Sequence, residues 1–491
     1  MGLILWAAPL LAIIMALISN GNKWIHTINV CLASVLVLAA IFATRSVVLY
    51  EKLQYTAFGG VFYLDSLSII VLDIVVVISF LVSIYSVGYL IEEQKRGKMN
   101  EKRIKLFYVL INSFIFAMVL ALTVNNIGIL WVAIEATTLA STFLVGFYND
   151  MHAIEAAWKY VIICSVGIAI ALLGIIFLHL SSVGVIDPSQ ALQMQVLFQH
   201  AKELNTHILR LSFIFIFIGF GTKAGLAPMH TWLPDAHSQA PSPVSALLSG
   251  VLLNSAMYAI IRTTSIVNKN LGDSHFTGRI LIAFGLLSII AAAVFILTQK
   301  DYKRLLAYSS IEHMGIIAIA VGIFSPLSIF AGLFHMINHS LTKSMLFLAS
   351  GNILHKYGTR NISDVKALFR ILPYTGTVFL IGLFAISGTP PFSIFASEIN
   401  VLVSIFAQYR FFLGGGIIIL LAIIFAGIAV TLFRIFHETK EPEFQMKREK
   451  MSSGIGVLLI LMVLICVMGI YMPTGLSDII IKAQLIVTGG I

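Results

Sequence analysis

The sequence predicts an all-α protein that crosses a lipid bilayer many times. Hydrophobic residues make up 59% of the chain, charged residues only 11%, and the mean hydropathy is +0.98. A water-soluble domain usually carries about 25% charged residues. The 491 residues also contain no long polar block. The composition therefore excludes a soluble catalytic domain and indicates a polytopic membrane protein.

Apolar runs along the chain predict about fourteen membrane spans. A transmembrane helix needs about 20 mostly apolar residues to cross a hydrocarbon core of roughly 30 Å. The runs lie near residues 3–19, 27–48, 64–91, 106–123, 126–147, 155–180, 209–237, 242–263, 278–298, 302–323, 326–354, 373–408, 411–437 and 453–471.

Basic residues predict the orientation of these spans, because cytoplasmic loops carry the excess of Lys and Arg. The loop "EEQKRGKMNEKRIK" (92–105) alone holds six of them. We therefore expect this loop in the cytoplasm, positions 98 and 447 on the same face, and both termini outside. The expected location is the inner (cytoplasmic) membrane. The net charge of +9 is explained by this topology and not by nucleic-acid binding.

Other kinds of chemistry find no support in the sequence. The three cysteines, Cys31, Cys164 and Cys466, lie in apolar segments without metal-type spacing. No GxxxxGK loop, HExxH pair or nucleophile elbow is present. The first run, "MGLILWAAPLLAIIMALI", has no basic region before it and is expected to be an uncleaved helix. We therefore expect no catalytic residue, no metal and no cofactor.

Two of the spans carry helix-breaking residues. The seventh contains "GTKAGLAPMHTWLPDAH", with Pro228 and Pro234, and the twelfth contains "ISGTPPFSIFASE", with Pro390 and Pro391. Proline removes a backbone donor and clashes with the preceding turn, so each span should split into two half-helices. Paired interrupted helices indicate an ion site in transporters. The alternative is that the prolines only kink the helices.

A second pattern predicts an internal repeat. "VAIEAT" places Glu135 in the fifth span, and "SSIEHM" places Glu312 in the tenth. The same spacing carries Lys223 to within two residues of Glu398. The alternative is that the two "IE" pairs are a coincidence. The expected divisions are residues 1–105 (helices 1–3), 106–263 (repeat one), 278–437 (repeat two, inverted) and 453–491 (the C-terminal helix).

Ionisable residues within the spans are the candidate site. A charge at the centre of a membrane helix costs about 2.5–3.5 kcal/mol on insertion scales, so such residues should face one another or a wetted interior. In the eleventh span they recur at every fourth position and share one helix face, which suits either proton relay or structural hydrogen bonding. The candidates are Glu135, Lys223, His230, Glu312, His313, His335, His339, Lys343 and Glu398. We expect Asp73 to be structural and His230 and His237 to cap a half-helix or transfer protons.

Three segments carry a family resemblance: "GTKAGLAPMHTWLPDAHSQAPSPVSALLSG", "DYKRLLAYSSIEHMGI" and "FASE". They resemble the antiporter-like proton-translocating subunits of respiratory complex I, Mrp-type antiporters and membrane-bound [NiFe] hydrogenases, in particular the hydrogenase-4 type. The resemblance implies fourteen helices with two inverted five-helix repeats. It also implies an ion pair of Glu135 with Lys223 and a proton exit at Glu398. Asn254 departs from the family, which commonly has a lysine there.

The resemblance implies partners as well as a site. The expected partners are other membrane subunits and, through them, a hydrogenase or quinone-reductase peripheral arm. Burial disfavours the charged form of Lys223 and a nearby carboxylate favours it, so a change in their distance would switch the lysine between holding and releasing a proton. Three alternatives remain: a subunit of a multisubunit (Mrp-type) Na⁺/H⁺ antiporter without a redox partner, a subunit of respiratory complex I, and a structural anchor whose ionisable groups only hold the bundle together.

Overall fold

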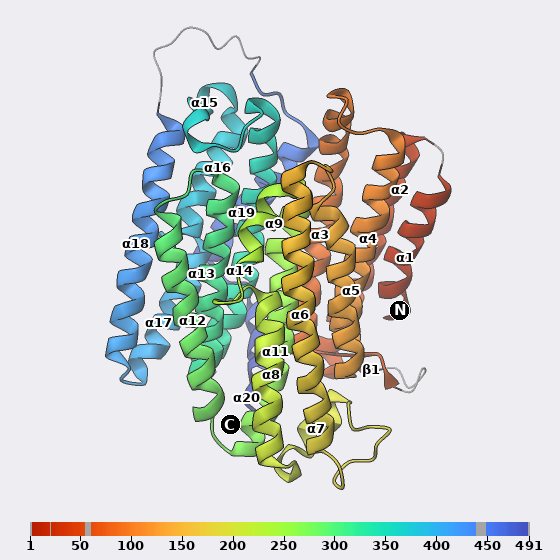
Figure 1. Ribbon diagram of the computed structural model, residues 1–491, viewed down its shortest axis with the longest axis vertical. Helices are drawn as coiled ribbons and strands as arrows, with labels where there is room; N and C mark the ends of the chain where they lie inside the picture. Colours follow the sequence, from red (N-terminus) through yellow and green to blue (C-terminus); the bar gives the residue numbers. More distant parts are fainter. Residues whose placement is uncertain (1, 20, 55–59, 438–447, 490–491) are drawn as a thin grey trace.

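The computed structural model describes residues 2–19, 21–54, 60–437 and 448–489, which form one bundle of helices running along its long axis (Figure 1). The helices are α1 (Gly2–Ile18), α2 (Asn22–Tyr50), α3 (Ser66–Lys95), α4 (Glu101–Thr123), α5 (Ile127–Val145), α6 (Met151–Ser181), α7 (Met194–Gln199), α8 (Thr206–Ala224), α9 (Trp232–Gln239), α10 (Ser242–Leu247), α11 (Leu253–Leu271), α12 (His275–Ile296), α13 (Tyr302–Ile323), α14 (Pro326–Tyr357), α15 (Leu368–Ile371), α16 (Pro373–Ile386), α17 (Ser393–Ala407), α18 (Phe411–Phe436), α19 (Ser453–Ile470) and α20 (Thr474–Thr488). The fold is therefore all-α, as the sequence predicts.

The described helices have the length and composition of membrane spans. Eleven are long and apolar enough to cross a membrane, and α1, α16 and α17 are shorter apolar helices. The most apolar windows of the α10–α11 segment and of α13 are wholly buried, whereas only 28% of the corresponding window of α18 is buried. Apolar side chains on the outer helices thus face the surroundings, as expected for contact with lipid.

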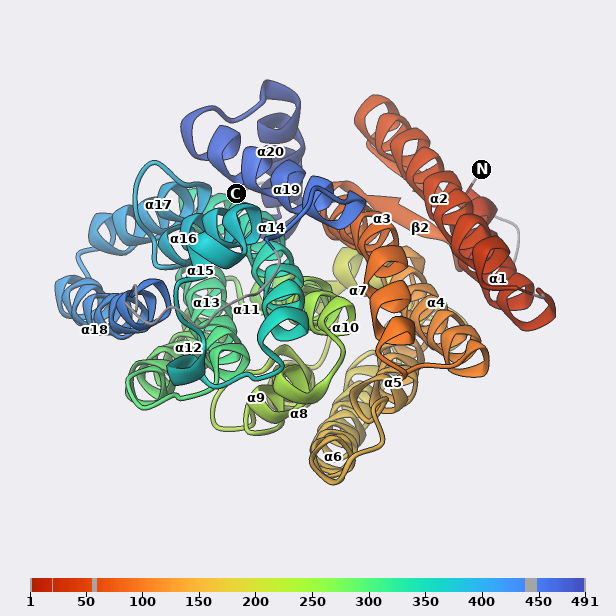
Figure 2. The same ribbon diagram turned by 90° about the horizontal axis from the view of Figure 1, so that it is seen from above.

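Helix α14 lies at the centre of the bundle when it is viewed from above (Figure 2). It packs against α3, α10, α13, α16, α17, α19 and α20. Helices α6 and α18 lie at the periphery, and α1 and α2 form one edge. The helix with the regular series of ionisable residues is therefore surrounded by protein on all sides.

The seventh predicted span is interrupted, as its glycines and prolines predict. Helices α8 and α9 enclose a break at residues 225–231. Gly225 ends α8 with φ 76°, and a Cβ there would lie 2.5 Å from Leu233 Cδ1, so only glycine fits. Pro228 lies in the break. Pro234 lies in the first turn of α9, where a missing N–H leaves no helical hydrogen bond unmade.

The twelfth predicted span is also interrupted. Helices α16 and α17 enclose a break at residues 387–392, which contains Pro390 and Pro391. Gly388 has φ 65°, and a Cβ at this position would overlap the carboxylate of Glu398. Glycine therefore both makes the turn and leaves room for an acidic side chain.

Several smaller elements were not predicted. Helix α20 follows α19 and packs against α3 and α14. Strands β1 (Lys52–Gln54) and β2 (Tyr63–Asp65) pair antiparallel between α2 and α3. The long segment after α6 contains α7. The strands and α7 are too short for an apolar run to reveal them, and α20 contains charged and polar residues such as Asp478 and Lys482.

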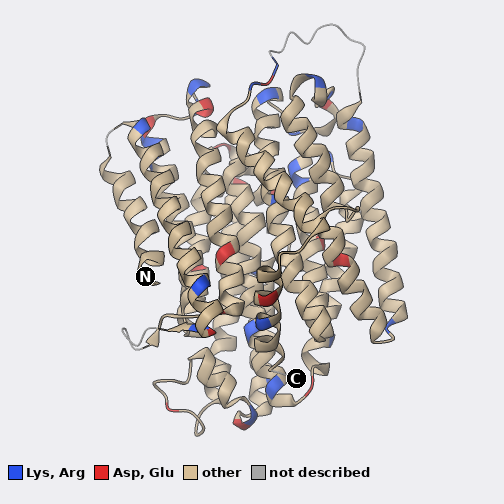
Figure 3. Ribbon diagram, turned by 180° about the vertical axis from the view of Figure 1, so that it is seen from behind, with Lys and Arg blue, Asp and Glu red and all other residues tan. Residues whose placement is uncertain are grey.

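The turn at residues 96–100 and the segment 358–361 line one cavity at the end of the bundle where α15 lies, here called the basic end (Figure 1). Lys and Arg lie at several helix ends there (Figure 3). The N-terminus lies about half-way along the bundle and the C-terminus lies towards the opposite end (Figure 1). At the start of α1, Trp6 Nε1 donates to Thr123 Oγ1 at 2.7 Å, at the far end of α4. Gly489 lines a cavity at that far end with residues of β2 and α11. The membrane face that each end occupies stays a prediction.

Position 447, which we expect on the same face as position 98, lies outside the described residues. The nearby segment 448–450 is described and lies at the basic end. There the Glu449 carboxylate accepts the backbone N–H groups of Tyr374 and Thr375, both at 3.0 Å. Helix α19 therefore begins at the same end of the bundle as the α3–α4 turn.

Cysteine labelling tests the orientation. In a background whose native cysteines are serine, we expect cysteines at Lys98 and Lys450 to react with an impermeant reagent only from the cytoplasmic side. A cysteine at Gln190, which is exposed at the opposite end, should react only from outside. Labelling of positions 98 and 450 from opposite sides would contradict the arrangement of the spans.

Candidate functional site

Most ionisable residues that the sequence singles out lie inside the bundle. Burial of this many polar groups requires partners, because an unpaired charge is costly in an apolar interior. Glu135 and Asp73 are partly buried. The buried members are Lys223, His230, Glu312, His313, His335, His339, Lys343 and Glu398.

The predicted pair of Glu135 and Lys223 is bridged by a hydroxyl group. Lys223 Nζ donates to Thr138 Oγ1 at 2.8 Å, and Thr138 Oγ1 donates to Glu135 Oε2 at 3.2 Å. Ser165 Oγ donates to the other carboxylate oxygen at 2.9 Å. The two charged groups thus communicate through Thr138, which can both accept and donate a proton.

An aromatic group forms the other side of the Lys223 site. Tyr160 Oη accepts from Lys223 Nζ at 2.6 Å and lies 2.7 Å from Ser141 Oγ. Its ring packs against Trp232, with ring centroids 4.8 Å apart. The indole N–H of Trp232 donates to the Thr222 carbonyl at 2.9 Å, where the break frees helical carbonyls. The lysine site and the break are therefore built from the same side chains.

The histidines of α13 and α14 form a second cluster. His313 Nδ1 lies 3.0 Å from His335 Nε2, within hydrogen-bond distance. The ring of His339 lies 5.5 Å from that of His313, measured between centroids, and neither of its nitrogens has a hydrogen-bond partner in the described part of the chain. His313 therefore lies between the two α14 histidines, so the contact runs across the helices and not along α14.

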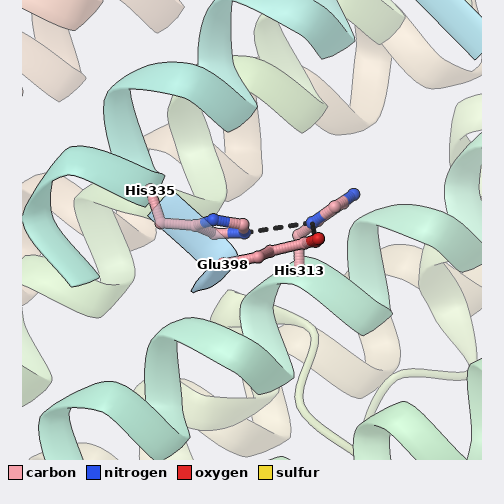
Figure 4. Close-up of side chains that lie close together, drawn as sticks. All are labelled: His313, His335 and Glu398. Atoms are coloured by element: carbon pink, nitrogen blue, oxygen red, sulfur yellow. Dashed lines mark hydrogen bonds and ion pairs between the residues drawn. The ribbon is translucent and has the colours of Figure 1, made fainter. Parts of the chain in front are cut away.

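Glu398 reaches the same cluster from α17. Its Oε1 atom lies 3.8 Å from His313 Nδ1, and Figure 4 shows the carboxylate beside both imidazole rings. His313 Nε2 lies 3.1 Å from the Ile386 carbonyl, at the second break. His335 Nδ1 lies 2.9 Å from Ser397 Oγ. If Ser397 donates to His335, then His335 can donate to His313 and His313 to the Ile386 carbonyl, so that all three hydrogen bonds point the same way.

Lys343, one turn beyond His339, is held by neutral groups. Its Nζ donates to the Leu306 carbonyl at 2.7 Å and to the Ser309 hydroxyl. Glu312 is also buried on α13 and interacts electrostatically with Lys343 and Glu398. Lys343 thus lies near a hydroxyl group and a carboxylate in the second half of the chain, as Lys223 does in the first half.

His237, which the sequence predicts to cap a half-helix or transfer protons, is buried, as is Lys303, which the sequence analysis did not select. Both ring nitrogens of His237 lack hydrogen-bond partners among the described residues, and the ring lies 5.4 Å from that of Phe347. Lys303 and Lys343 lie close enough to His237 to interact electrostatically. Lys303 lies in the first turn of α13, where a lysine normally indicates a solvated helix end, so nothing in the sequence indicates that it is buried.

A cavity of about 810 Å³ opens beside Lys303 at the basic end. Its lining includes Ala240, whose carbonyl accepts a hydrogen bond from Lys303 Nζ at 2.8 Å. Lys98, Asp301 and Arg360 also line the cavity. A residue that lines the cavity is therefore hydrogen-bonded to a fully buried lysine.

Three other candidates lie apart from these contacts. Thr44 Oγ1 donates to both Asp73 carboxylate oxygens, at 3.0 and 2.9 Å, which suits a structural role. Asn254 Nδ2 donates to Ser340 Oγ at 2.7 Å and so ties α11 to α14. The carbonyl of His230 accepts the N–H of Leu233 at the start of α9, and none of the hydrogen bonds in the described segments joins its ring to another ionisable group.

Fold and site together define a polytopic membrane protein built around interrupted helices and a buried set of ionisable side chains. Residues 124–426 match the family described as "NADH:quinone oxidoreductase/Mrp antiporter, TM". Residues 55–98 match "NADH-Ubiquinone oxidoreductase (complex I), chain 5 N-terminus". The chain belongs to this family of antiporter-like membrane subunits.

Individual relatives fall into two groups. The hydrogenase-4 component F homolog of Methylacidiphilum infernorum is 42% identical over 351 residues, which cover 71% of this chain and 74% of that protein. Hydrogenase-4 component B of Escherichia coli is 31% identical, over 75% of this chain and 55% of its own length. Na⁺/H⁺ antiporter subunit A1 of Staphylococcus aureus is 30% identical, over 86% of this chain and 53% of its own length. The match spans about half the length of the latter two.

Two solved structures share the fold. The archaeal membrane-bound sulfane sulfur reductase superposes with a TM-score of 0.87 at 24% identity, over 99% of this chain and 97% of that one. The Mrp complex of a Dietzia species superposes with a TM-score of 0.84 at 18% identity, over 99% of this chain and 96% of that one. At these identities the likeness concerns the arrangement of helices alone.

The first break gives a stability prediction. Ser288 Oγ accepts the buried N–H of Ala227 at 2.9 Å, so Ser288→Ala should leave this donor unpaired and destabilise the protein by about 1–3 kcal/mol. The control Ser86→Ala removes a buried hydroxyl that donates only to a carbonyl of its own helix. Thermal unfolding of the purified complex measures both. Equal midpoints for the two variants would contradict the role of Ser288.

Proposed function

We propose that the chain translocates protons across the membrane as a subunit of a redox-driven complex of the hydrogenase-4 type, without a catalytic site of its own. The observation that carries the proposal is the series of buried lysine, histidine and glutamate side chains that lies between two interrupted helices. Ionisable groups inside membrane proteins commonly mark ion pathways. The 42% identity to a hydrogenase-4 component F homolog supports the choice of complex.

The proposed route has two entries and one exit. Protons from the cytoplasm are held at Lys223, whose hydroxyl partners can pass a proton towards Glu135. The cavity at the basic end leads by way of Lys303 to His237. The two branches meet at the α13 and α14 cluster, and Glu398 releases the proton outwards.

The switch at Lys223 depends on its distance from Glu135. Burial disfavours the ammonium form, and the carboxylate favours it. Moving one proton against 100 mV costs about 2.3 kcal/mol. Removing an ion from water costs several kcal/mol. A small increase in the distance between Lys223 and Glu135 across the Thr138 bridge can therefore destabilise the ammonium form enough to drive release of the proton. The adjacent break gives Lys223 room to move.

The proposal includes a repeat and an orientation. Residues 106–263 and 278–437 each contain an interrupted helix and a buried lysine beside a hydroxyl, which supports two inverted repeats. Both termini would lie outside the inner membrane. Partners would be other membrane subunits and, through them, a hydrogenase or quinone-reductase arm.

A second candidate function is that of a subunit in a multisubunit Na⁺/H⁺ antiporter. It is favoured by the similarity to antiporter subunit A1, which extends over 86% of this chain. In vesicles that contain the purified complex, a sodium gradient would drive proton movement if this function holds. Proton movement that needs a reductant and ignores sodium would favour the redox-driven complex.

The Glu135 site gives the main functional prediction. Glu135→Gln keeps the shape and removes the counter-charge, so Lys223 should remain neutral and stop cycling. We expect the complex to assemble and proton uptake per assembled complex to fall about tenfold or more, since about 1.4 kcal/mol changes an equilibrium tenfold. Lys223→Ala should have the same effect, and the double variant should be no worse.

The control for this experiment is Glu155→Gln, which neutralises an exposed glutamate paired with Lys159 at 2.6 Å. It should leave proton uptake unchanged, because exposed ion pairs contribute little. If the residues were only structural, Glu135→Gln would harm assembly, and uptake per assembled complex would stay normal. Normal uptake in that variant would end the case for this site.

The histidine cluster gives a separate prediction. His335 and His339 both approach His313, so each can partly replace the other. Replacing both with alanine should slow proton uptake much more than either single change. His26→Ala, which removes a buried histidine bonded to Tyr108 in another part of the bundle, is the control. A double variant with normal uptake would show that the cluster is structural.

A further inference from the structure

We propose that His313, His335 and Glu398 form a binding site for a transition-metal ion such as Zn²⁺, which replaces the proton and blocks transfer. One nitrogen from each histidine and one carboxylate oxygen lie within 4.8 Å of one another. Imidazole nitrogen and carboxylate oxygen are the ligands that Zn²⁺ takes in proteins. The blocking effect rests on the proposed function, whereas the binding itself does not.

The spacing of the three ligand atoms suits a tetrahedral ion. With metal–ligand bonds of roughly 2.0–2.1 Å, neighbouring ligand atoms lie about 3.3 Å apart. The two nitrogens are 3.0 Å apart, and His313 Nδ1 is 3.8 Å from Glu398 Oε1. Shifts of a few tenths of an ångström would correct these two distances. The Glu398 carboxylate lies within 4.8 Å of the His335 nitrogen and would have to approach it by up to about 1.5 Å to reach coordination distance.

The outer nitrogen of each ring has the partner that a metal ligand needs. Metal-binding histidines usually donate their other N–H to a carbonyl, carboxylate or water, which fixes the ring. A carbonyl can only accept, so Ile386 takes the N–H of His313 Nε2 and leaves Nδ1 without a hydrogen. His335 Nδ1 faces the hydroxyl of Ser397.

Ser397 allows His335 to take either tautomer. When Ser397 donates to His335 Nδ1, the opposite nitrogen carries a hydrogen and donates to His313. The Ser397 hydroxyl can instead donate to the Ile394 carbonyl at 2.9 Å and accept from His335 Nδ1. In that arrangement His335 Nε2 and His313 Nδ1 both present lone pairs to each other. Only a cation between them, a proton or a metal ion, makes this arrangement favourable.

Glu398 supplies the negative charge of the site. Its Oε1 atom is buried and accepts no hydrogen bond from any described residue, so it is available as a ligand. A dication would compensate the buried negative charge of Glu398, and the two neutral imidazoles would complete its protein ligands.

The three ligands come from three helices on both sides of a break. His313 lies on α13, His335 on α14 and Glu398 on α17, and Figure 4 shows them converging. A bound ion would hold α17 against the other two helices. It would also occupy the nitrogen lone pairs through which a proton must pass, so transport should stop while the ion stays bound.

Equilibrium binding of radioactive zinc to the purified complex tests the site directly. We expect the wild type to bind one zinc ion per chain. In His335→Ala and in Glu398→Gln this binding should be lost, or its dissociation constant should rise at least about 10–100-fold. Affinity should weaken at lower pH, because the ligands must be deprotonated. His152→Ala, at an exposed histidine of α6, should bind zinc as the wild type does. Unchanged zinc stoichiometry and affinity in both ligand variants would overturn the proposal.

Proton uptake in vesicles tests the consequence. Zinc should inhibit the wild type reversibly, and a chelator should restore uptake. Glu398→Gln, which retains both histidines, should need at least about tenfold more zinc for the same fractional inhibition of its remaining uptake. If the variants lose zinc binding but zinc does not inhibit the wild type, the metal site stands and the proposed proton route is rejected.

Discussion

A helix that stops inside a membrane must find partners for the backbone groups it frees, and this requirement shapes the whole interior. Lipid offers no hydrogen bonds, so these partners come from side chains. Trp232 donates to the Thr222 carbonyl at the first break, and His313 lies 3.1 Å from the Ile386 carbonyl at the second. Trp232 also packs on Tyr160, which binds the buried lysine. The side chains that stabilise the breaks are therefore those that position the ionisable groups.

The buried lysines Lys223 and Lys343 lie next to neutral oxygen atoms rather than directly on carboxylates. Lys223 is bonded to Thr138 and Tyr160, and Lys343 to the hydroxyl of Ser309. A direct buried ion pair is costly to separate, since each partner would be left unpaired. A hydroxyl between the charges weakens the attraction and can pass a proton in either direction. This arrangement suits a group that must change its protonation state repeatedly.

The sequence predicted the all-α membrane fold and both interruptions, because apolar length and proline chemistry are local properties. It missed α20, whose 15 residues include charged and polar side chains, and the β-hairpin, whose strands are short. The spacing of His335, His339 and Lys343 predicted that they share one face of α14, and in the structure this face lies towards α13. Thr138 could not be found in this way, since a hydroxyl becomes part of a site only through contacts between distant helices.

Helix α14 carries the most regular ionisable series and is also surrounded by other helices. Its partners lie on α13 and α17, so a proton that leaves His335 must cross to another helix. Hydrogen bonds weaken steeply beyond about 3.2 Å or away from linear geometry. A relative shift of about 1 Å between these helices would therefore open or close the path. The break before α17 makes Glu398 the group best able to make such a shift, so in the proposed route it is the group that would open or close the path.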